Sequence, residues 1–211
     1  MYEKKLIILA QGDSITDGNR DRINLDDYNH VLGHGYVQMA AGMLGSEFPG
    51  RGIYFVNRGV SGDNIDQMTA RWQKDCLDIH PDILSIFIGV NQADEIHYEA
   101  KMRFLLEQTF AITGRIMLIQ PVSLILTENE QEISRQRAVC AEQEIISKLC
   151  LEYKLLELKT GDLLRSALAE YDQPRYWLWD GIHPTPAFHN RIAQEYVNLL
   201  KKSGWLESCA Q

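Results

Sequence analysis

Four short segments of this chain carry the polar groups that acyl transfer requires. They supply a hydroxyl at residues 12–18, glycine-rich backbone at 57–64, a carboxamide at 89–92, and a carboxylate with an imidazole at 180–185. A serine hydrolase needs a nucleophile, a base, a group that orients the base, and N–H donors for the oxyanion. Together the four segments could supply every one of these parts.

Each signal is weak by itself, because its residues have ordinary structural uses. Ser14 could cap a helix, and Asn91 could be a turn residue. Gly62 could simply permit a positive φ. Asp180 and His183 are more suggestive, since a carboxylate three residues from a histidine can fix the tautomer of its ring, but such a pair could equally cap the last helix. The presence of all four segments in one chain favours the catalytic interpretation.

Short apolar runs predict the strands that bring these segments together. The run at 83–88 (ILSIFI) is continuous, as expected for a strand covered on both faces. The other predicted strands are at residues 6–10, 53–56, 116–119 and 155–158. The first three polar segments each follow a predicted strand directly. Because ligands bind at the carboxyl ends of parallel strands, we expect these segments to meet at one edge of a sheet.

Amphipathic stretches between the strands predict helices. One stretch has apolar residues three or four positions apart: Ile65, Met68, Trp72, Cys76 and Ile79. Residues 98–113 and 130–151 also have helical patterns, and Pro184 and Pro186 suit the start of a last helix. Alternating strands and helices predict an α/β fold with a parallel sheet between two helical layers. No repeat or linker interrupts the pattern, so residues 1–211 are expected to form one domain.

In order and spacing, the four segments resemble the signature blocks of the GDSL/SGNH hydrolases, a family of serine esterases and lipases. GDSITDG resembles the nucleophile block, NRGVSGDN the glycine block, GVNQ the asparagine block and DGIHPT the block with aspartate and histidine. The resemblance implies a flavodoxin-like, three-layer α/β/α sandwich with a five-stranded parallel sheet. The third block departs from the family pattern, Gly-x-Asn-Asp, because Gln92 stands in the place of the second aspartate.

The resemblance also implies a role for each residue. Ser14 would attack the ester carbonyl, His183 would accept its proton, and Asp180 would orient His183. The oxyanion would be held by the backbone N–H groups of Ser14 and Gly62 and by the side-chain amide of Asn91. No cofactor and no metal is expected, and the four cysteines have no zinc-ligand spacing.

The expected substrate is a small acyl ester, acetyl above all, on a carbohydrate. The strings GDSITDG, LGHGY, NRGVSGD, RW and YWLWDGIHPT are similar to acetylesterase-like members of the family, and the loop after the first block is polar. Trp177 or Trp179 could stack on a sugar ring, although at least one of them is expected in the core. Arg58 and Arg71 could hold an anionic substrate, although surface pairing with acids is the more ordinary use of an arginine.

Two alternatives stay open. The first is a lysophospholipase or acyl-thioesterase on the same fold, which would need an apolar channel for a long chain. The second is a non-catalytic, flavodoxin-like binding module. The chain has no P-loop and no Gly-x-Gly-x-x-Gly, and its set of serine, asparagine, aspartate and histidine is intact, which argues against the second alternative.

Composition excludes some classes of partner. The formal net charge of −8 disfavours nucleic acid and anionic membranes. No stretch approaches the roughly 20 apolar residues of a membrane helix, and the apolar run at 6–10 is too short for a secretory signal. We therefore expect a cytoplasmic enzyme that acts on a small molecule. Its oligomeric state cannot be predicted from these patterns.

Overall fold

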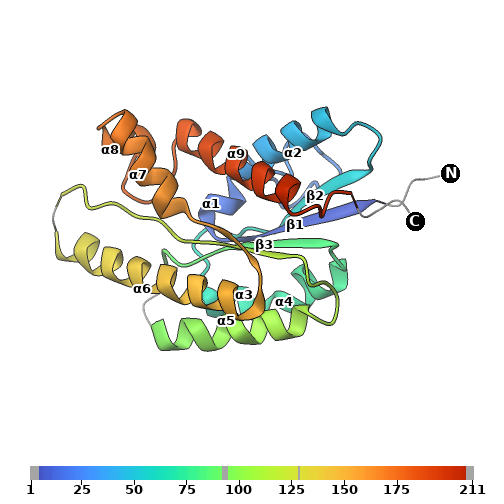
Figure 1. The fold of residues 1–211 in the computed structure, drawn as a ribbon, viewed down its shortest axis with the longest axis horizontal. Helices are drawn as coiled ribbons and strands as arrows, with labels where there is room; N and C mark the ends of the chain where they lie inside the picture. The colour runs from blue at the N-terminus through green and yellow to red at the C-terminus, as the bar shows by residue number, and fades with distance from the viewer. Residues whose placement is uncertain (1–4, 92–94, 128, 208–211) are drawn as a thin grey trace.

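A computed structural model describes residues 5–91, 95–127 and 129–207, and its sheet has five strands, all parallel (Figure 1). The strands are β1 (Leu6–Gly12), β2 (Ile53–Asn57), β3 (Ile83–Phe87), β4 (Ile116–Ile119) and β5 (Leu156–Leu158). Their order in the sheet is β2-β1-β3-β4-β5. The predicted five-stranded parallel sheet is therefore confirmed, and this order is the flavodoxin-like one.

Helices cover both faces of the sheet, which completes the three-layer α/β/α arrangement (Figure 1). One layer contains α1 (Ser14–Asp17), α2 (Tyr36–Glu47), α7 (Thr160–Glu170), α8 (Pro174–Trp177) and α9 (Pro186–Lys202). The other contains α3 (Ile65–Ala70), α4 (Trp72–Asp75), the 3-10 turn η1 (Leu77–Ile79), α5 (Glu95–Thr109) and α6 (Glu130–Tyr153).

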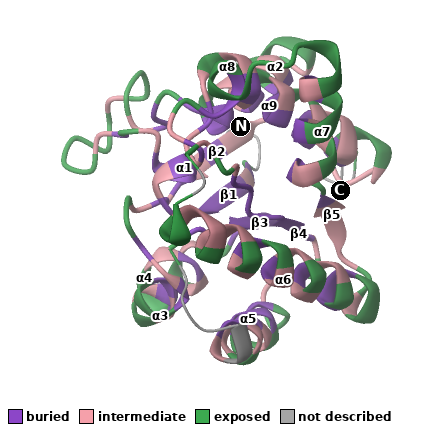
Figure 2. Ribbon diagram, turned by 90° about the vertical axis from the view of Figure 1, so that its left-hand side faces the viewer, coloured by how far each residue is buried: buried purple, intermediate pink, exposed green. Residues whose placement is uncertain are grey.

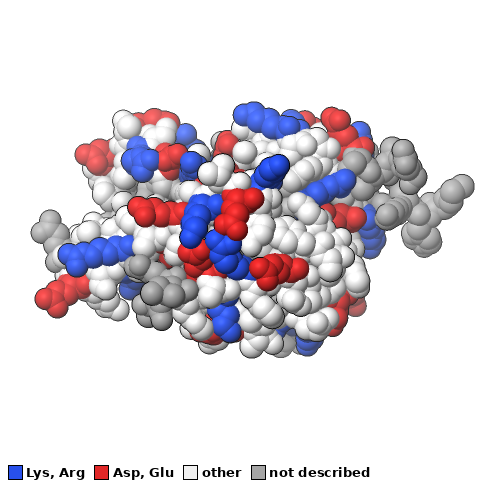
Figure 3. All heavy atoms as spheres, turned by 60° about the horizontal axis from the view of Figure 1, so that its bottom comes forward, with Lys and Arg blue, Asp and Glu red and all other residues white. Residues whose placement is uncertain are grey.

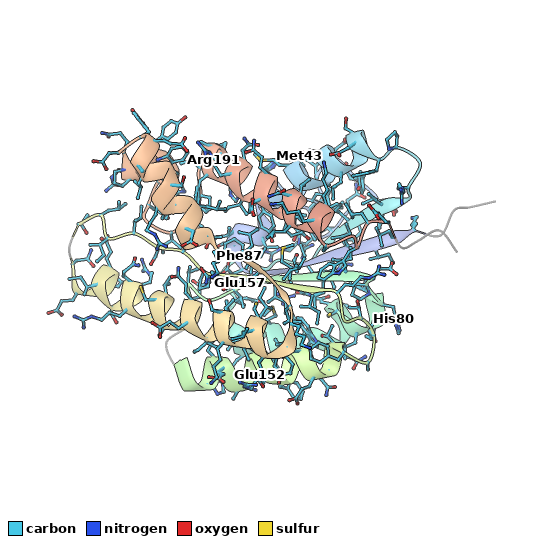
Figure 4. The ribbon with its side chains drawn as sticks, in the orientation of Figure 1. Met43, His80, Phe87, Glu152, Glu157 and Arg191 are labelled. Atoms are coloured by element: carbon cyan, nitrogen blue, oxygen red, sulfur yellow. The ribbon has the colours of Figure 1, made fainter. Side chains whose placement is uncertain are left out.

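The strands supply two hydrophobic cores, because successive residues of a strand point to opposite faces of the sheet. In β3, Ile83 and Phe87 belong to the core beneath α2 and α9, whereas Leu84 and Ile86 belong to the core beneath α3, α5 and α6. Figure 4 shows Phe87 in the middle of the molecule, between the two helical layers. Burial on both faces explains why this strand reads as a continuous apolar run.

The prediction of one continuous helix from residue 65 to residue 79 is wrong. The chain forms α3, breaks at Arg71, and continues as α4 and then η1. The predicted apolar face is buried all the same, since Ile65, Met68, Trp72 and Cys76 are at most 2% exposed. The patterns also did not predict α2 and α7. In α2, Gly42 and Gly45 weaken the helical signal.

The outer surfaces of the helices are charged. Figure 3 shows basic and acidic side chains next to one another on the side that carries α5 and α6. These two helices are linked by Arg103, which contacts Glu99 in α5 and Glu152 in α6, and by a pair between Lys148 and Glu99. In the described parts of the chain, no helix is both long enough and apolar enough to cross a bilayer.

We predict that Leu118→Ala lowers the free energy of unfolding by about 2–5 kcal/mol, because Leu118 is fully buried in β4 and its removal leaves a cavity. Urea unfolding at 25 °C measures the change. The control is Leu151→Ala in α6, where the side chain is 83% exposed and the expected change is within about 0.5 kcal/mol. Equal losses in the two variants would contradict this assignment of the core.

Candidate active site

The polar segments meet at the edge of the sheet where the strands end (Figure 2). Ser14 follows β1, Asn91 follows β3, and His183 lies on the loop before α9. The strand order reverses between β1 and β3, since β1 is followed by β2 on one side and by β3 on the other. In open α/β sheets, such a reversal creates the crevice in which ligands bind.

Ser14, His183 and Asp180 form a continuous chain of hydrogen bonds. The Ser14 Oγ lies 2.9 Å from His183 Nε2, and His183 Nδ1 lies 2.7 Å from the Asp180 Oδ2. An ionised carboxylate can only accept hydrogen bonds, so Nδ1 carries the proton and Nε2 is left to accept the hydroxyl hydrogen of Ser14. This is the arrangement in which an imidazole can act as a base toward a serine.

Asp180 is held in its ionised form by the groups around it. Burial by itself would raise the pKa of this carboxyl. The hydrogen bonds from the backbone and ring of His183 and from the backbone of Ile182 outweigh burial and lower the pKa below its ordinary value. Asp180 therefore presents a negative charge to His183 at neutral pH.

The loop that carries Asp180 and His183 is closed by a contact between its two ends. An antiparallel bridge joins Leu178 to Pro184. Inside the loop, Gly181 has a φ of 89°, and its carbonyl accepts a hydrogen bond of 2.8 Å from the backbone of Leu124. A β-carbon at Gly181 would lie 2.8 Å from the Leu124 carbonyl oxygen, so a glycine is needed there. The loop is thus fixed to the segment after β4.

The nucleophile sits in a tight turn that leads from β1 into α1. The Asp13 carboxylate accepts a hydrogen bond of 3.1 Å from the backbone of Ile15 and so caps the helix. Asp13 is 1% exposed, and this burial raises its pKa from 3.8 to about 7. A β-carbon at Gly12 would lie 2.2 Å from Thr16 Oγ1 and 2.4 Å from the Phe87 carbonyl oxygen. Only glycine fits this position.

The loop after β2 packs directly on the nucleophile turn. A β-carbon at Gly59 would lie 2.3 Å from the backbone nitrogen of Asp17, so the two backbones touch. The buried Asn57 side chain fixes this contact, since its amide donates to the carbonyls of Thr16 at 2.7 Å and Leu32 at 2.9 Å. Its oxygen accepts from the Gly59 backbone at 2.8 Å. All of the hydrogen-bonding groups of this amide are therefore used to hold the two loops together.

Asp17 holds the same loop one turn further on. Its Oδ2 accepts hydrogen bonds from the Ser61 hydroxyl at 2.5 Å and from the Ser61 backbone at 3.3 Å, and also from Arg22. Gly62, the next residue, has a φ of 86°, a conformation that glycine adopts without strain. Asp17 therefore fixes the backbone that leads into the predicted oxyanion glycine.

Arg71 joins this loop to β1 and, indirectly, to Asn91. Its guanidinium donates to the Asp63 carboxylate at 2.7 Å, the Gln11 carboxamide at 2.7 Å, and the carbonyls of Arg58 at 2.8 Å and Gly12 at 3.2 Å. The backbone carbonyl of Asp63 in turn accepts a hydrogen bond of 3.1 Å from the Asn91 side-chain amide. One Asn91 N–H is used in this way, and the other has no partner among the described residues.

Comparison with known proteins agrees with this geometry. Residues 10–191 match the GDSL-like Lipase/Acylhydrolase family. The chain belongs to this family. An acetylxylan esterase from Geobacillus stearothermophilus is 32% identical to this chain in an alignment that covers 92% of each of the two chains. The family resemblance is therefore confirmed, and the protein is a carboxylic ester hydrolase.

Two solved structures are similar over nearly the whole chain. A putative GDSL-like lipase from Parabacteroides merdae has a TM-score of 0.85 at 29% identity, with 96% of this chain and 97% of that chain covered. Axe2, an acetylxylan esterase from Geobacillus stearothermophilus, has a TM-score of 0.81 at 26% identity, with 95% and 96% covered. Other Axe2 structures are described as catalytic mutants in which a serine, an aspartate or a histidine is replaced by alanine.

The two tryptophans that were expected to contact a sugar or to lie in the core, Trp177 and Trp179, are in different environments. Trp177 is 5% exposed, donates its indole N–H to the Tyr171 carbonyl at 2.9 Å and packs against Phe188. Trp177 is therefore the member of the pair that lies in the core, as expected for at least one of them, and its buried ring is not available to stack on a sugar. Trp179 is 58% exposed and stacks on the His183 ring, with 6.2 Å between ring centroids. Gln92, where the third block departs from the family pattern, lies outside the described residues.

A groove of about 480 Å³ opens beside the site. It is lined by Val90, Asn91, Gln131, Ser134, Arg135, Ala138 and Ile182. The sequence patterns did not predict this contribution of α6, nor the positioning contacts of Asp17, Asn57 and Arg71. For Asp17, Asn57 and Arg71 a signal existed, because all three lie in strings that are similar to acetylesterase-like sequences. For Arg135 the neighbours become evident only in the folded chain.

We predict that Asp13→Asn stabilises the protein increasingly as the pH rises from about 4 to about 7. The pKa of Asp13 rises from 3.8 to about 7 on folding, so in this interval the folded state keeps a proton that the unfolded state has released. Ionisation therefore lowers the free energy of unfolding of the parent protein by up to about 1.4 kcal/mol per pH unit. Asparagine keeps the capping oxygen and does not ionise.

Urea unfolding at several pH values in this interval measures the difference between variant and parent. The control is Asp26→Asn, which makes the same substitution at an exposed position. A difference for Asp13→Asn that stays constant with pH would show that this carboxyl titrates normally in the folded state.

Proposed function

We propose that this esterase removes acetyl or other short acyl groups from a carbohydrate through an acyl-enzyme intermediate. The observation that carries the proposal is the pair of hydrogen bonds that links Ser14 to His183 at 2.9 Å and His183 to Asp180 at 2.7 Å. A serine hydroxyl becomes a nucleophile when a base accepts its proton, and the base works only in the correct tautomer. Both conditions are met by these contacts.

In the proposed mechanism, Ser14 Oγ attacks the ester carbonyl carbon while its proton moves to His183 Nε2. The oxyanion of the tetrahedral intermediate accepts hydrogen bonds from the backbone N–H groups of Ser14 and Gly62 and from the free amide N–H of Asn91. His183 then gives its proton to the leaving alcohol oxygen. Water, activated by His183, hydrolyses the acyl-enzyme and restores Ser14. No cofactor or metal takes part.

The preference for a short acyl group on a sugar is supported by the surroundings of the triad. Two uncharged side chains that line the groove beside it, Gln131 and Ser134, can bind hydroxyl groups, which suits a polar alcohol. The exposed ring of Trp179 offers a face on which a sugar can stack. The Geobacillus stearothermophilus relative carries the name acetylxylan esterase, and its catalytic mutants replace the same three residue types. A cytoplasmic location stays a prediction from the sequence.

Ser14→Ala is expected to lower kcat/KM for 4-nitrophenyl acetate by at least about 10⁴-fold, because the nucleophile is lost. Ser166→Ala, an exposed serine of α7, is the matched control and should keep parental activity. A serine-directed phosphonate should label Ser14, as read by peptide mass spectrometry. Labelling of Ser61, or substantial activity in a folded Ser14→Ala variant, would overturn the assignment.

Among 4-nitrophenyl esters from C2 to C12, acetate or propionate is expected to be the best substrate. Burial of each CH₂ group is worth about 0.8 kcal/mol, but only an apolar channel makes this free energy available. The described groove beside the triad is lined in part by polar side chains, so kcat/KM should fall as the chain lengthens, and acetylated sugars should also be hydrolysed. A steady rise in kcat/KM from C2 to C10 would instead favour a lysophospholipase or thioesterase, while the serine mechanism would stand.

A further inference from the structure

No acid among the described residues neutralises Arg135. It is half-buried in α6 and lines the groove beside Asn91 and Ile182, yet it makes no hydrogen bond or ion pair with any residue that the structure describes. By contrast, Arg20 contacts Asp17, Arg58 contacts Asp75 and Arg71 contacts Asp63. Those three guanidiniums serve the protein itself, and that of Arg135 is available to a ligand.

None of the described residues that line the groove is acidic. Besides Arg135, its polar groups are the uncharged side chains of Asn91, Gln131 and Ser134. The acid nearest in sequence, Glu132, is occupied elsewhere, since its carboxylate accepts hydrogen bonds from the backbone of Leu126 and from Thr127. A partly desolvated positive charge without a counter-ion is costly, so an anion that enters the groove is favoured.

The groove lies next to residues that are proposed to act on the ester. The leaving alcohol oxygen must lie close to His183 Nε2, because that nitrogen returns the proton. The groove is bounded by Ile182, the neighbour of His183, and by Asn91, which is proposed to bind the oxyanion. We assign the alcohol half of the ester to this groove, where a ring that extends from the triad toward α6 would reach Arg135.

We propose that Arg135 binds a carboxylate on the alcohol half of the ester, so that the preferred substrate is an acetylated carbohydrate that contains a sugar acid. A planar guanidinium fits a carboxylate through two parallel hydrogen bonds, and such charge-assisted bonds are stronger than those to neutral hydroxyls. Gln131 and Ser134, on the same helix, supply partners for ring hydroxyls. This inference rests on the proposed function, since it assigns the substrate class of the same site.

The test compares two matched esters, mono-O-acetyl galacturonate and mono-O-acetyl galactose, with the parent enzyme and Arg135→Gln. The parent should prefer the anionic ester by roughly tenfold to hundredfold in kcat/KM, and Arg135→Gln should lose this preference while it keeps its activity on the neutral ester. The matched control is Arg137→Gln, which removes the same charge from an exposed position of α6 outside the groove lining. Its preference should be unchanged.

A second measurement does not depend on turnover of the sugar esters. Galacturonate should inhibit hydrolysis of 4-nitrophenyl acetate competitively in the parent and much more weakly in Arg135→Gln, whereas galactose should affect both enzymes alike. Arg135→Lys keeps the charge but cannot form two parallel hydrogen bonds with a carboxylate, so it should retain only part of the preference. This variant serves as the test if Arg135→Gln does not fold.

The outcomes separate this inference from the proposed function. If neither sugar ester nor 4-nitrophenyl acetate is hydrolysed, the proposed function fails. If esters are hydrolysed but the parent does not distinguish the two sugars, or Arg135→Gln and Arg137→Gln behave alike, the role of Arg135 is wrong and the esterase assignment stands.

Discussion

The guanidinium of Arg71 is the contact on which the geometry of the site most depends. It binds the end of β1 through Gln11 and Gly12, and the loop after β2 through Asp63. The Asp63 carbonyl then fixes Asn91. A network of this kind acts as a unit at low local dielectric, since each of its bonds strengthens its neighbours. The turn that carries Ser14, the loop after β2 and Asn91 after β3 are thus all held in place, directly or indirectly, by the Arg71 guanidinium.

The same residue explains why the periodicity between residues 65 and 79 predicted a longer helix than the chain forms. Apolar spacing reports which side chains are buried on one face, and that part of the prediction holds for Met68 and Trp72. It does not report whether every backbone group continues the helical hydrogen bonding. Arg71 ends α3 and begins α4, and at this break its side chain reaches the partners at the end of β1. The break between α3 and α4 therefore places Arg71 where it can bind the end of β1.

Much of the fold and the reactive residues could be predicted because their signals are local. β4 is an apolar run bounded as predicted, since it is buried on both faces. Asp180 and His183 are three residues apart, so their contact depends on little besides one loop. Ser14 and Asn91 follow strands directly, and parallel pairing brings strand ends together without any further information. Their catalytic roles stay predictions, and Ser14→Ala tests that of the nucleophile.

The remaining parts of the site depend on contacts between distant segments. Asn57 could be assigned its structural role only after Thr16 and Leu32, 41 and 25 residues away, were brought against it. Asp17 accepts a hydrogen bond from Ser61, which is 44 residues away in the sequence. The role proposed for Arg135 depends on the lack of an acidic partner among the described residues, which no pattern within α6 reveals. Such roles are properties of tertiary packing rather than of residue type and spacing.

Two carboxyl groups near the triad show how the fold assigns opposite behaviour to the same residue type. Asp180 accepts hydrogen bonds from two backbone N–H groups and from the His183 ring, and these lower its pKa despite partial burial. Asp13 is buried almost completely with one bond from the Ile15 backbone, and burial raises its pKa to about 7. The number of donors, set against desolvation, decides the direction of each shift.

This difference suits the chemistry proposed for Ser14. A charged Asp180 stabilises the imidazolium that forms when His183 takes a proton. Asp13 is adjacent to Ser14 in the chain, and a negative charge there would oppose the oxyanion that develops during attack. A carboxyl whose ionised form is disfavoured by burial avoids much of that repulsion and still caps α1 through its oxygen. The fold therefore places negative charge on the side of the base and restricts it on the side of the nucleophile.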